Sequence, residues 1–280
     1  MKLLLSSIDK GIALLLLLLL SGCTAPSFAQ PAEGPPAIKD LPLKAKFLTT
    51  DKLQQAYIVD DNNDVIKLSP QGQELFRYSN KTLGPLGYVD ATDPFNVLLY
   101  YPEQLTVLTL DRTMNLTGEY RLWDLGLVGS GAVGLSNDNQ IWLYDTNDFK
   151  LKKVDRKGNT LLESDDLSMT LNQFINPTFI LERNNWVYLN EPELGVLVFD
   201  NFGNYARTIG IKTNYFQLYE GQLLYPEKGQ LMAFHLQSLL TSQIQKQLQL
   251  EEGDQVRVEK GVTYVARGKG GIEIYKTVPQ

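Results

Sequence analysis

The chain has 280 residues, of which 43% are apolar, and its formal net charge at pH 7 is −6. This length and apolar content are sufficient for one sizeable domain with its own core. Because the chain is acidic and has no cluster of lysine and arginine, it does not suit a phosphate backbone, which excludes nucleic-acid binding as a function class.

Residues 1–22 are typical of a secretory signal peptide. Lys2 and Lys10 lead into an apolar run, Leu14 to Leu20, which is too short to span a bilayer comfortably. The run ends in Leu20-Ser21-Gly22-Cys23, which resembles the lipobox of bacterial lipoproteins. The resemblance implies cleavage before Cys23 and acylation of this cysteine, for example with palmitate. The protein would then be attached to the membrane through this lipid anchor.

The residues that follow the lipobox indicate the cellular location of the protein. Thr24 stands where an aspartate retains lipoproteins at the inner membrane of enteric bacteria, so the resemblance implies the outer membrane. Two other routes stay open: cleavage after Ser27-Phe28-Ala29, which gives a soluble secreted protein starting at Gln30, and retention of the apolar run as an anchor. Cys23 is the only cysteine, so its acylation leaves no thiol for disulfide, redox or metal chemistry.

Residues 23–36 are predicted to form a proline-rich tether between the lipidated cysteine and the folded domain. In an extended form, at about 3.1 Å per residue, this segment reaches roughly 40 Å. The tether would let the domain contact a partner at some distance from the bilayer. Residues 37–280 form the remaining predicted domain.

The domain repeats one pattern of strands and turns. The clearest copy runs from Trp186 to Gly210 and reads as strand, turn, strand, turn, strand. Its second turn, Asp200 to Asn204, has counterparts at Ser69 to Gln73, Asp111 to Asn115 and Asp155 to Asn159. Met114 replaces the turn glycine in one copy, so this turn is expected to close with a costlier backbone.

The strands upstream of these turns begin about 36 to 45 residues apart, a period typical of propeller blades. Each blade also needs an inner strand, which precedes these strands in the sequence. These inner strands are expected at Ala45 to Leu48, Leu86 to Val89, Ala132 to Leu135, Thr178 to Leu181, Tyr215 to Leu218 and Gln255 to Val258. Helix is nearly excluded because no apolar stripe of helical period persists for three turns. The segment from Leu239 to Leu250 fits an outer strand and a short helical insertion equally well.

The repeats predict an all-β fold, a six-bladed β-propeller of four-stranded antiparallel blades. The last blade ends near Thr277 with three strands, and Ala37 to Leu41 has no place in the first blade. We therefore expect this N-terminal segment to pair as the outer strand of the last blade and to close the ring. The repeats resemble those of the six-bladed NHL and YWTD propellers, although the Tyr-Trp-Thr-Asp signature is absent. In layout the chain resembles the propeller lipoproteins of the outer-membrane protein assembly machinery, which usually have eight blades.

The turns between the second and third strands lie at the same end of the propeller as the links between blades. Loops on a rigid scaffold are where binding residues concentrate, and exposed aromatic residues commonly anchor interfaces. We expect this end to bind an envelope protein through an acidic rim with tyrosines. The rim comprises Asp60, Asp61, Asp64, Tyr101, Glu103, Asp145, Glu191, Glu193, Tyr225 and Glu227. Since these residue types are also common turn formers, the prediction depends on the whole set.

No catalytic group, metal site or cofactor is predicted. The segment Asp60 to Asp64 lacks the glycine and the distal glutamate of an EF-hand loop, and His235 is a lone histidine in a predicted strand. The favoured interpretation is a non-enzymatic scaffold for protein interactions in an envelope complex. The alternative is a propeller hydrolase, similar to a lactonase, or a small-ligand or glycan binder. Its site would lie at the central channel near Asp90, Asp93 or Asp138.

Overall fold

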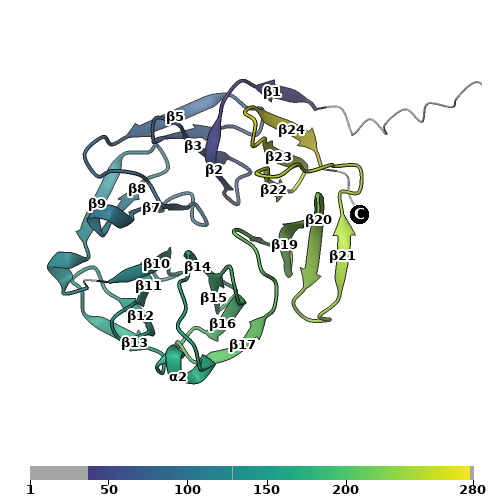
Figure 1. Cartoon of the computed structure of the whole chain (residues 1–280). Helices are drawn as coiled ribbons and strands as arrows, with labels where there is room; N and C mark the ends of the chain where they lie inside the picture. Colours follow the sequence, from purple (N-terminus) through teal and green to yellow (C-terminus); the bar gives the residue numbers. More distant parts are fainter. Residues whose placement is uncertain (1–36, 128, 278–280) are drawn as a thin grey trace, which may run out of the picture. The chain divides into compact units, whose positions relative to one another are not determined.

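The computed structural model describes residues 37–127 and 129–277, which form six four-stranded antiparallel sheets arranged as blades around a common axis (Figure 1). The all-β, six-bladed propeller is confirmed. The predicted signal peptide, the lipidation site Cys23 and the tether up to residue 36 lie outside the described residues and stay predictions. Within the described ranges, no helix is both long enough and apolar enough to cross a membrane.

Blades 1 to 3 follow the chain in order, each from its inner strand to its outer strand. Blade 1 consists of β2 (Ala45–Thr50), β3 (Ala56–Asp60), β4 (Asp64–Leu68) and β5 (Glu74–Ser79). Blade 2 consists of β6 (Tyr88–Asp90), β7 (Val97–Tyr101), β8 (Thr106–Leu110) and β9 (Leu116–Arg121). Blade 3 consists of β10 (Ser130–Leu135), β11 (Ile141–Asp145), β12 (Lys150–Val154) and β13 (Thr160–Glu163).

Blades 4 and 5 continue this order, and blade 6 combines the two ends of the domain. Blade 4 consists of β14 (Phe179–Arg183), β15 (Trp186–Glu191), β16 (Gly195–Asp200) and β17 (Tyr205–Ile209). Blade 5 consists of β18 (Gln217–Tyr219), β19 (Gln222–Glu227), β20 (Gln230–His235) and β21 (Thr241–Ile244). Blade 6 consists of β22 (Gln255–Glu259), β23 (Val262–Ala266), β24 (Ile272–Lys276) and β1 (Lys39–Leu41).

The N-terminal strand closes the ring as predicted. β1 pairs antiparallel with β24, with Lys39 opposite Ile274 and Leu41 opposite Ile272, and Figure 1 shows the two strands side by side. On the inner side of the same blade, β22 lies against β2 of blade 1. The strand that begins the domain therefore covers an edge of β24 that would otherwise be open to another chain.

The core lies between the blades and explains the apolar runs of the sequence. The second and third strands of a blade have neighbouring blades on both faces, so their side chains are buried on both sides of the sheet. In blade 2, every residue of β7 and β8 is buried. The outer strand β9 has one face in solvent, and most of its exposed residues are polar.

The bounds of the inner strands differ from the predicted ones by one or two residues. β6 begins at Tyr88 because the N–H of Leu86 donates to the Asn63 side chain instead of the strand ladder. β18 begins at Gln217, two residues later than predicted. The ambiguous segment after Leu239 forms the outer strand β21 and no helix.

Short helices occur only in turns and links of the described chain. They are the 3₁₀ helices η1 (Pro102–Gln104) and η2 (Trp123–Leu125) and the α-helix α2 (Leu167–Leu171). α2 lies in the link between blades 3 and 4, and the carboxylate of Asp166 caps it by accepting from the N–H groups of Ser168 and Met169.

The turns between the third and fourth strands pack against the preceding blade. Gly72 has a φ of 71°, and an added Cβ would lie 2.7 Å from the Ile274 side chain of blade 6. Met114 holds the same turn position in blade 2 with a φ of 65°, as the sequence predicted. Its side chain is buried in a cluster that includes Tyr57 and Val65 of blade 1. The burial of this side chain offsets the cost of its backbone.

Candidate functional site

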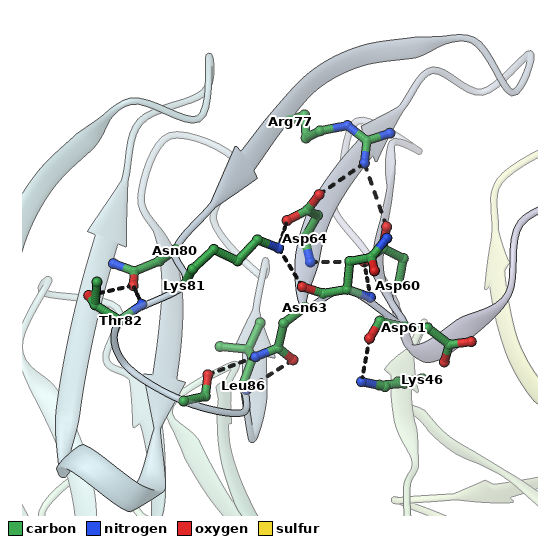
Figure 2. A network of polar contacts seen from close by, with 12 residues as sticks. Lys46, Asp60, Asp61, Asn63, Asp64, Arg77, Asn80, Lys81, Thr82 and Leu86 are labelled. Atoms are coloured by element: carbon green, nitrogen blue, oxygen red, sulfur yellow. Dashed lines mark hydrogen bonds and ion pairs between the residues drawn. The ribbon is translucent and has the colours of Figure 1, made fainter.

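The predicted rim turn of blade 1 is held by hydrogen bonds and ion pairs (Figure 2). The Asp60 Oδ1 atom accepts from the N–H groups of Asn62 and Asp64, at 2.9 Å each. Arg77 lies 3.6 Å from Asp60 and 3.3 Å from Asp64, and the Lys81 ammonium lies 2.5 Å from Asp64. The hydrogen bond from Lys81 is the main cause that lowers the pKa of Asp64. These carboxylates are therefore engaged with cations of the protein itself.

The same turn is fastened to the link that leads into blade 2. The Asn63 amide donates to the Gly84 carbonyl at 2.7 Å and accepts from the Leu86 N–H at 3.2 Å (Figure 2). Asp61 points into solvent and pairs with Lys44 at 3.1 Å, a surface ion pair that contributes little stability. Asp61 is thus the most accessible acid of this turn.

The two tyrosines predicted on the rim are buried, so the expectation of exposed aromatic anchors at these positions is wrong. Tyr101 ends β7 and Tyr225 lies in β19, and both side chains belong to the core between blades. Burial raises the pKa of Tyr101, and among the described residues its hydroxyl has no hydrogen-bond partner.

The acids predicted on the rims of the other blades divide into buried and exposed groups. Asp145 is buried and pairs with the buried Lys152 at 2.8 Å. Glu191 is buried and accepts from the N–H groups of Asn176 and Glu193. Binding by the rim stays a prediction, and the acids that are exposed to support it are Asp61, Glu103, Glu193 and Glu227.

Large apolar side chains that the sequence did not reveal are exposed around blade 3. Trp123 in η2 is 64% exposed, and Leu161 on the outer strand β13 is 48% exposed. Met169 on α2 and Phe174, which follows α2, are 80% and 75% exposed. Figure 1 shows α2 at the perimeter of the propeller, next to β13. We call Trp123, Leu161, Met169 and Phe174 the blade-3 surface.

Backbone contacts connect the parts of the blade-3 surface through one turn. The turn between β11 and β12 bonds to the preceding link, from the Thr146 N–H to the Gly129 carbonyl at 2.9 Å. It also bonds to the following link, from the Leu167 N–H to the Phe149 carbonyl at 2.8 Å. The Phe149 ring lies 5.0 Å from the ring of Phe174. The links that carry the exposed side chains are thus held by the same blade.

Aromatic rings from four blades meet on the axis. Phe47 of β2 packs on Tyr88 of β6 at 5.7 Å, and Tyr88 stacks on Phe179 of β14 at 5.1 Å. Phe179 lies 5.0 Å from Phe216, which precedes β18. Because blade 3 separates Tyr88 from Phe179 around the ring, these two side chains can touch only in the interior. Apolar groups therefore fill the channel at this level.

A cavity of about 260 Å³ lies beside these rings and is lined by residues from the inner strands of five blades. Asp90, one of the candidates for a channel site, lines this cavity. Asp93 and Asp138 do not line it. Asp93 pairs with Lys52 at 3.7 Å and Asp138 with Lys153 at 2.7 Å. In the ranges that the structure describes, no group of three or more His, Cys, Asp or Glu residues could hold a metal ion.

Two carboxyl groups of the cavity have raised pKa values. Asp90 accepts from the N–H groups of Thr92 at 2.9 Å and Leu135 at 3.0 Å, but burial raises its pKa. Glu259 accepts from the Thr50 hydroxyl at 2.6 Å and the Gln217 amide at 3.0 Å. Burial raises the pKa of Glu259 to about 7. Both groups therefore hold a proton more readily than an exposed carboxyl.

Comparison with known proteins shows only the fold. No protein family and no curated protein matches the sequence. The chain is similar to the crystal structure of a catalytically inactive virginiamycin B lyase from Staphylococcus aureus with quinupristin, with a TM-score of 0.58 and 10% identity over 89% of this chain and 97% of that one. It is similar to a streptogramin B lyase with a TM-score of 0.52 and 14% identity over 90% and 86%.

A third solved structure is BamB from Moraxella catarrhalis. Its TM-score is 0.45, with 10% identity over 83% of each chain. The likeness to the two lyase structures shows a shared fold, and one fold hosts many functions.

Proposed function

We propose that this chain is a lipid-anchored β-propeller of the bacterial envelope that binds other envelope proteins and catalyses no reaction. The observation that carries the proposal is the blade-3 surface, with four large apolar side chains that are 48% to 80% exposed around one blade. These side chains come from β13 and from the two links that flank blade 3, so a partner that spans this blade would cover all of them, and exposed apolar patches mark interaction sites. The exposed acids of the rim would orient a partner with a complementary charge.

The N-terminal sequence supports the envelope location. Cys23 of the lipobox would carry the lipid, and Thr24 after it favours the outer membrane over the inner membrane. The tether of residues 23–36 would separate the propeller from the bilayer, so that a partner could reach its perimeter.

Two features favour a scaffold over an enzyme. The aromatic rings of Phe47, Tyr88, Phe179 and Phe216 occupy the axis and fill the channel at their level, which leaves a substrate only the small cavity of about 260 Å³ beside them. His235, the only histidine of the chain, contacts Gln222 of its own blade at 3.2 Å and does not line the central cavity. The lyase activity of the similar structures belongs to those proteins, since the shared feature is the fold.

Affinity purification of the full-length protein in mild detergent, followed by mass spectrometry, tests the proposal. The test variant combines Trp123→Ser and Phe174→Ser on the blade-3 surface. The matched control is Leu240→Ser, because Leu240 is also exposed but precedes β21 of blade 5, away from blade 3. We expect the wild type and the control to recover the same envelope protein and the double variant to lose it. Recovery of the protein alone, together with hydrolysis of a small ester or glycoside, would contradict the proposal.

A further inference from the structure

The central cavity contains two guanidinium groups without a carboxylate partner. The side chain of Arg183, at the end of β14, is half-buried and makes no hydrogen bond or ion pair with any described residue. Arg257 of β22 is only 6% exposed, and its side chain makes a single hydrogen bond in the described chain, from Nη1 to the Phe216 carbonyl at 3.3 Å. Its guanidinium also lies 5.4 Å from the centre of the Tyr215 ring. Most N–H donors of the two arginines are thus left for another group.

The acids of the cavity are poor counterions for these arginines. Arg183 lies close enough to lower the pKa of both Asp90 and Glu259, yet neither acid forms a salt bridge with it. The Asp90 oxygens already accept backbone N–H groups, and Glu259 already accepts from Thr50 and Gln217. Because burial favours the neutral form of both acids, the positive charge of the arginines is incompletely compensated.

Part of the cavity wall is apolar. It includes Tyr88, Phe216, Leu181 and Leu218, and the Phe216 carbonyl accepts from Arg257, so the apolar residues lie beside the arginines. The cavity has a volume of about 260 Å³. A ligand that matches this cavity is therefore small, with one charged end and one apolar end.

We propose that the central cavity binds a small organic carboxylate, with its anionic group between Arg183 and Arg257 and its apolar body against Tyr88 and Phe216. Guanidinium groups hold carboxylates through two parallel hydrogen bonds, which a planar carboxylate matches in geometry. A phosphate dianion fits less well, because Asp90 and Glu259 lie nearby and the apolar wall offers it no donors. This site is independent of the partner-binding surface proposed above.

Isothermal titration of the full-length protein with benzoate tests the site, because benzoate combines a planar carboxylate with a compact apolar ring. Benzamide is the neutral control of the same shape, and inorganic phosphate is the control for general anion binding. We expect saturable binding of benzoate and much weaker binding of the other two. The proposal is overturned if benzoate does not bind at concentrations up to roughly 10 mM, or if benzamide or phosphate binds as tightly.

A variant series connects the binding to the arginines. Arg183→Gln should weaken benzoate binding about tenfold or more, since it removes charge-assisted hydrogen bonds. The Arg183 side chain has no hydrogen-bond or ion-pair partner in the described chain, so this variant should fold normally. Arg121→Gln is the matched control, because Arg121 is exposed on β9 and does not line the cavity. Unchanged binding in Arg183→Gln, or equal losses in both variants, would overturn the assignment.

The pH dependence of binding provides a second readout that a purely structural role would not change. Besides Arg183 and Arg257, the groups that face Glu259 are Asp51, Tyr219 and Tyr264. Ionised Glu259 repels a bound carboxylate, whereas protonated Glu259 can donate a hydrogen bond to it. The affinity for benzoate should therefore fall as the pH rises through about 7. Glu259→Gln should remove this fall, and a variant with the same pH profile as the wild type would contradict the proposed site.

Discussion

Replacement of Met114 tests how the blades are held together. Met114 has a φ of 65° at a turn position where blades 1, 3 and 4 have glycine, and its side chain is buried between blades 1 and 2. Two effects therefore oppose each other at this residue. The left-handed backbone costs about 1 to 2 kcal/mol for a residue with a Cβ. Burial of the side chain in the core contributes more.

The magnitudes predict an unusual order of stability for two variants. Met114→Ala should lower the free energy of unfolding by about 2 to 5 kcal/mol, because it removes a buried side chain and keeps the strained backbone. Met114→Gly removes nearly the same side chain but relieves the strain. We therefore expect the glycine variant to be about 1 kcal/mol more stable than the alanine variant and still less stable than the wild type.

Equilibrium unfolding in urea measures these differences, with the midpoint and slope compared between variants. Met169→Ala is the matched control, because Met169 is exposed and its replacement should change the stability by less than about 0.5 kcal/mol. The reasoning is refuted if the alanine variant is at least as stable as the glycine variant. It is also refuted if neither replacement of Met114 destabilises the protein beyond the control.

Three further predictions concern single side chains. Glu182→Ala should destabilise the protein by about 3 kcal/mol in urea, because the buried indole N–H of Trp142, 2.6 Å from Glu182, loses its acceptor; a loss no greater than in Glu182→Gln would contradict this. The pKa of Glu259, about 7 in the folded state against an ordinary value of 4.5, means that the folded state binds more protons between these values. Wild-type stability should therefore fall by up to about 3 kcal/mol as the pH rises from 4.5 to 7, and Glu259→Gln should flatten the curve; a wild-type curve that rises would be inconsistent with a buried Glu259. Cys23→Ser should abolish acylation and partition into detergent, as measured by intact mass and phase separation, and an unlipidated wild-type protein would contradict the lipobox prediction.

The blade pattern could be predicted because it depends on local sequence. The second and third strands are buried on both faces, so they appear as short apolar runs separated by turn residues, at a period of about 40 residues. Closure of the ring by residues 37–41 followed from the missing strand of blade 6. The helix α2 could not be predicted, because five residues are too few to show a helical period.

The exposure of site residues could not be predicted from the sequence. Tyr101 and Glu103 belong to the same turn, yet the first is buried and the second is exposed, because the neighbouring blade covers only one of them. Nothing in the sequence around Trp123-Asp124 indicates that the Trp123 side chain is exposed. Arg183 and Arg257 are isolated charges on strands of different blades, and only closure of the ring brings them to one cavity.

Photo-crosslinking in living cells tests the proposed protein interaction most directly. A photoreactive amino acid is placed at Phe174 on the blade-3 surface and, in a separate variant, at the exposed Leu240 on blade 5. We predict a discrete adduct with one envelope protein from position 174 and no such adduct from position 240. The absence of an adduct at position 174, or the same adducts from both positions, would contradict the proposal that blade 3 binds a partner.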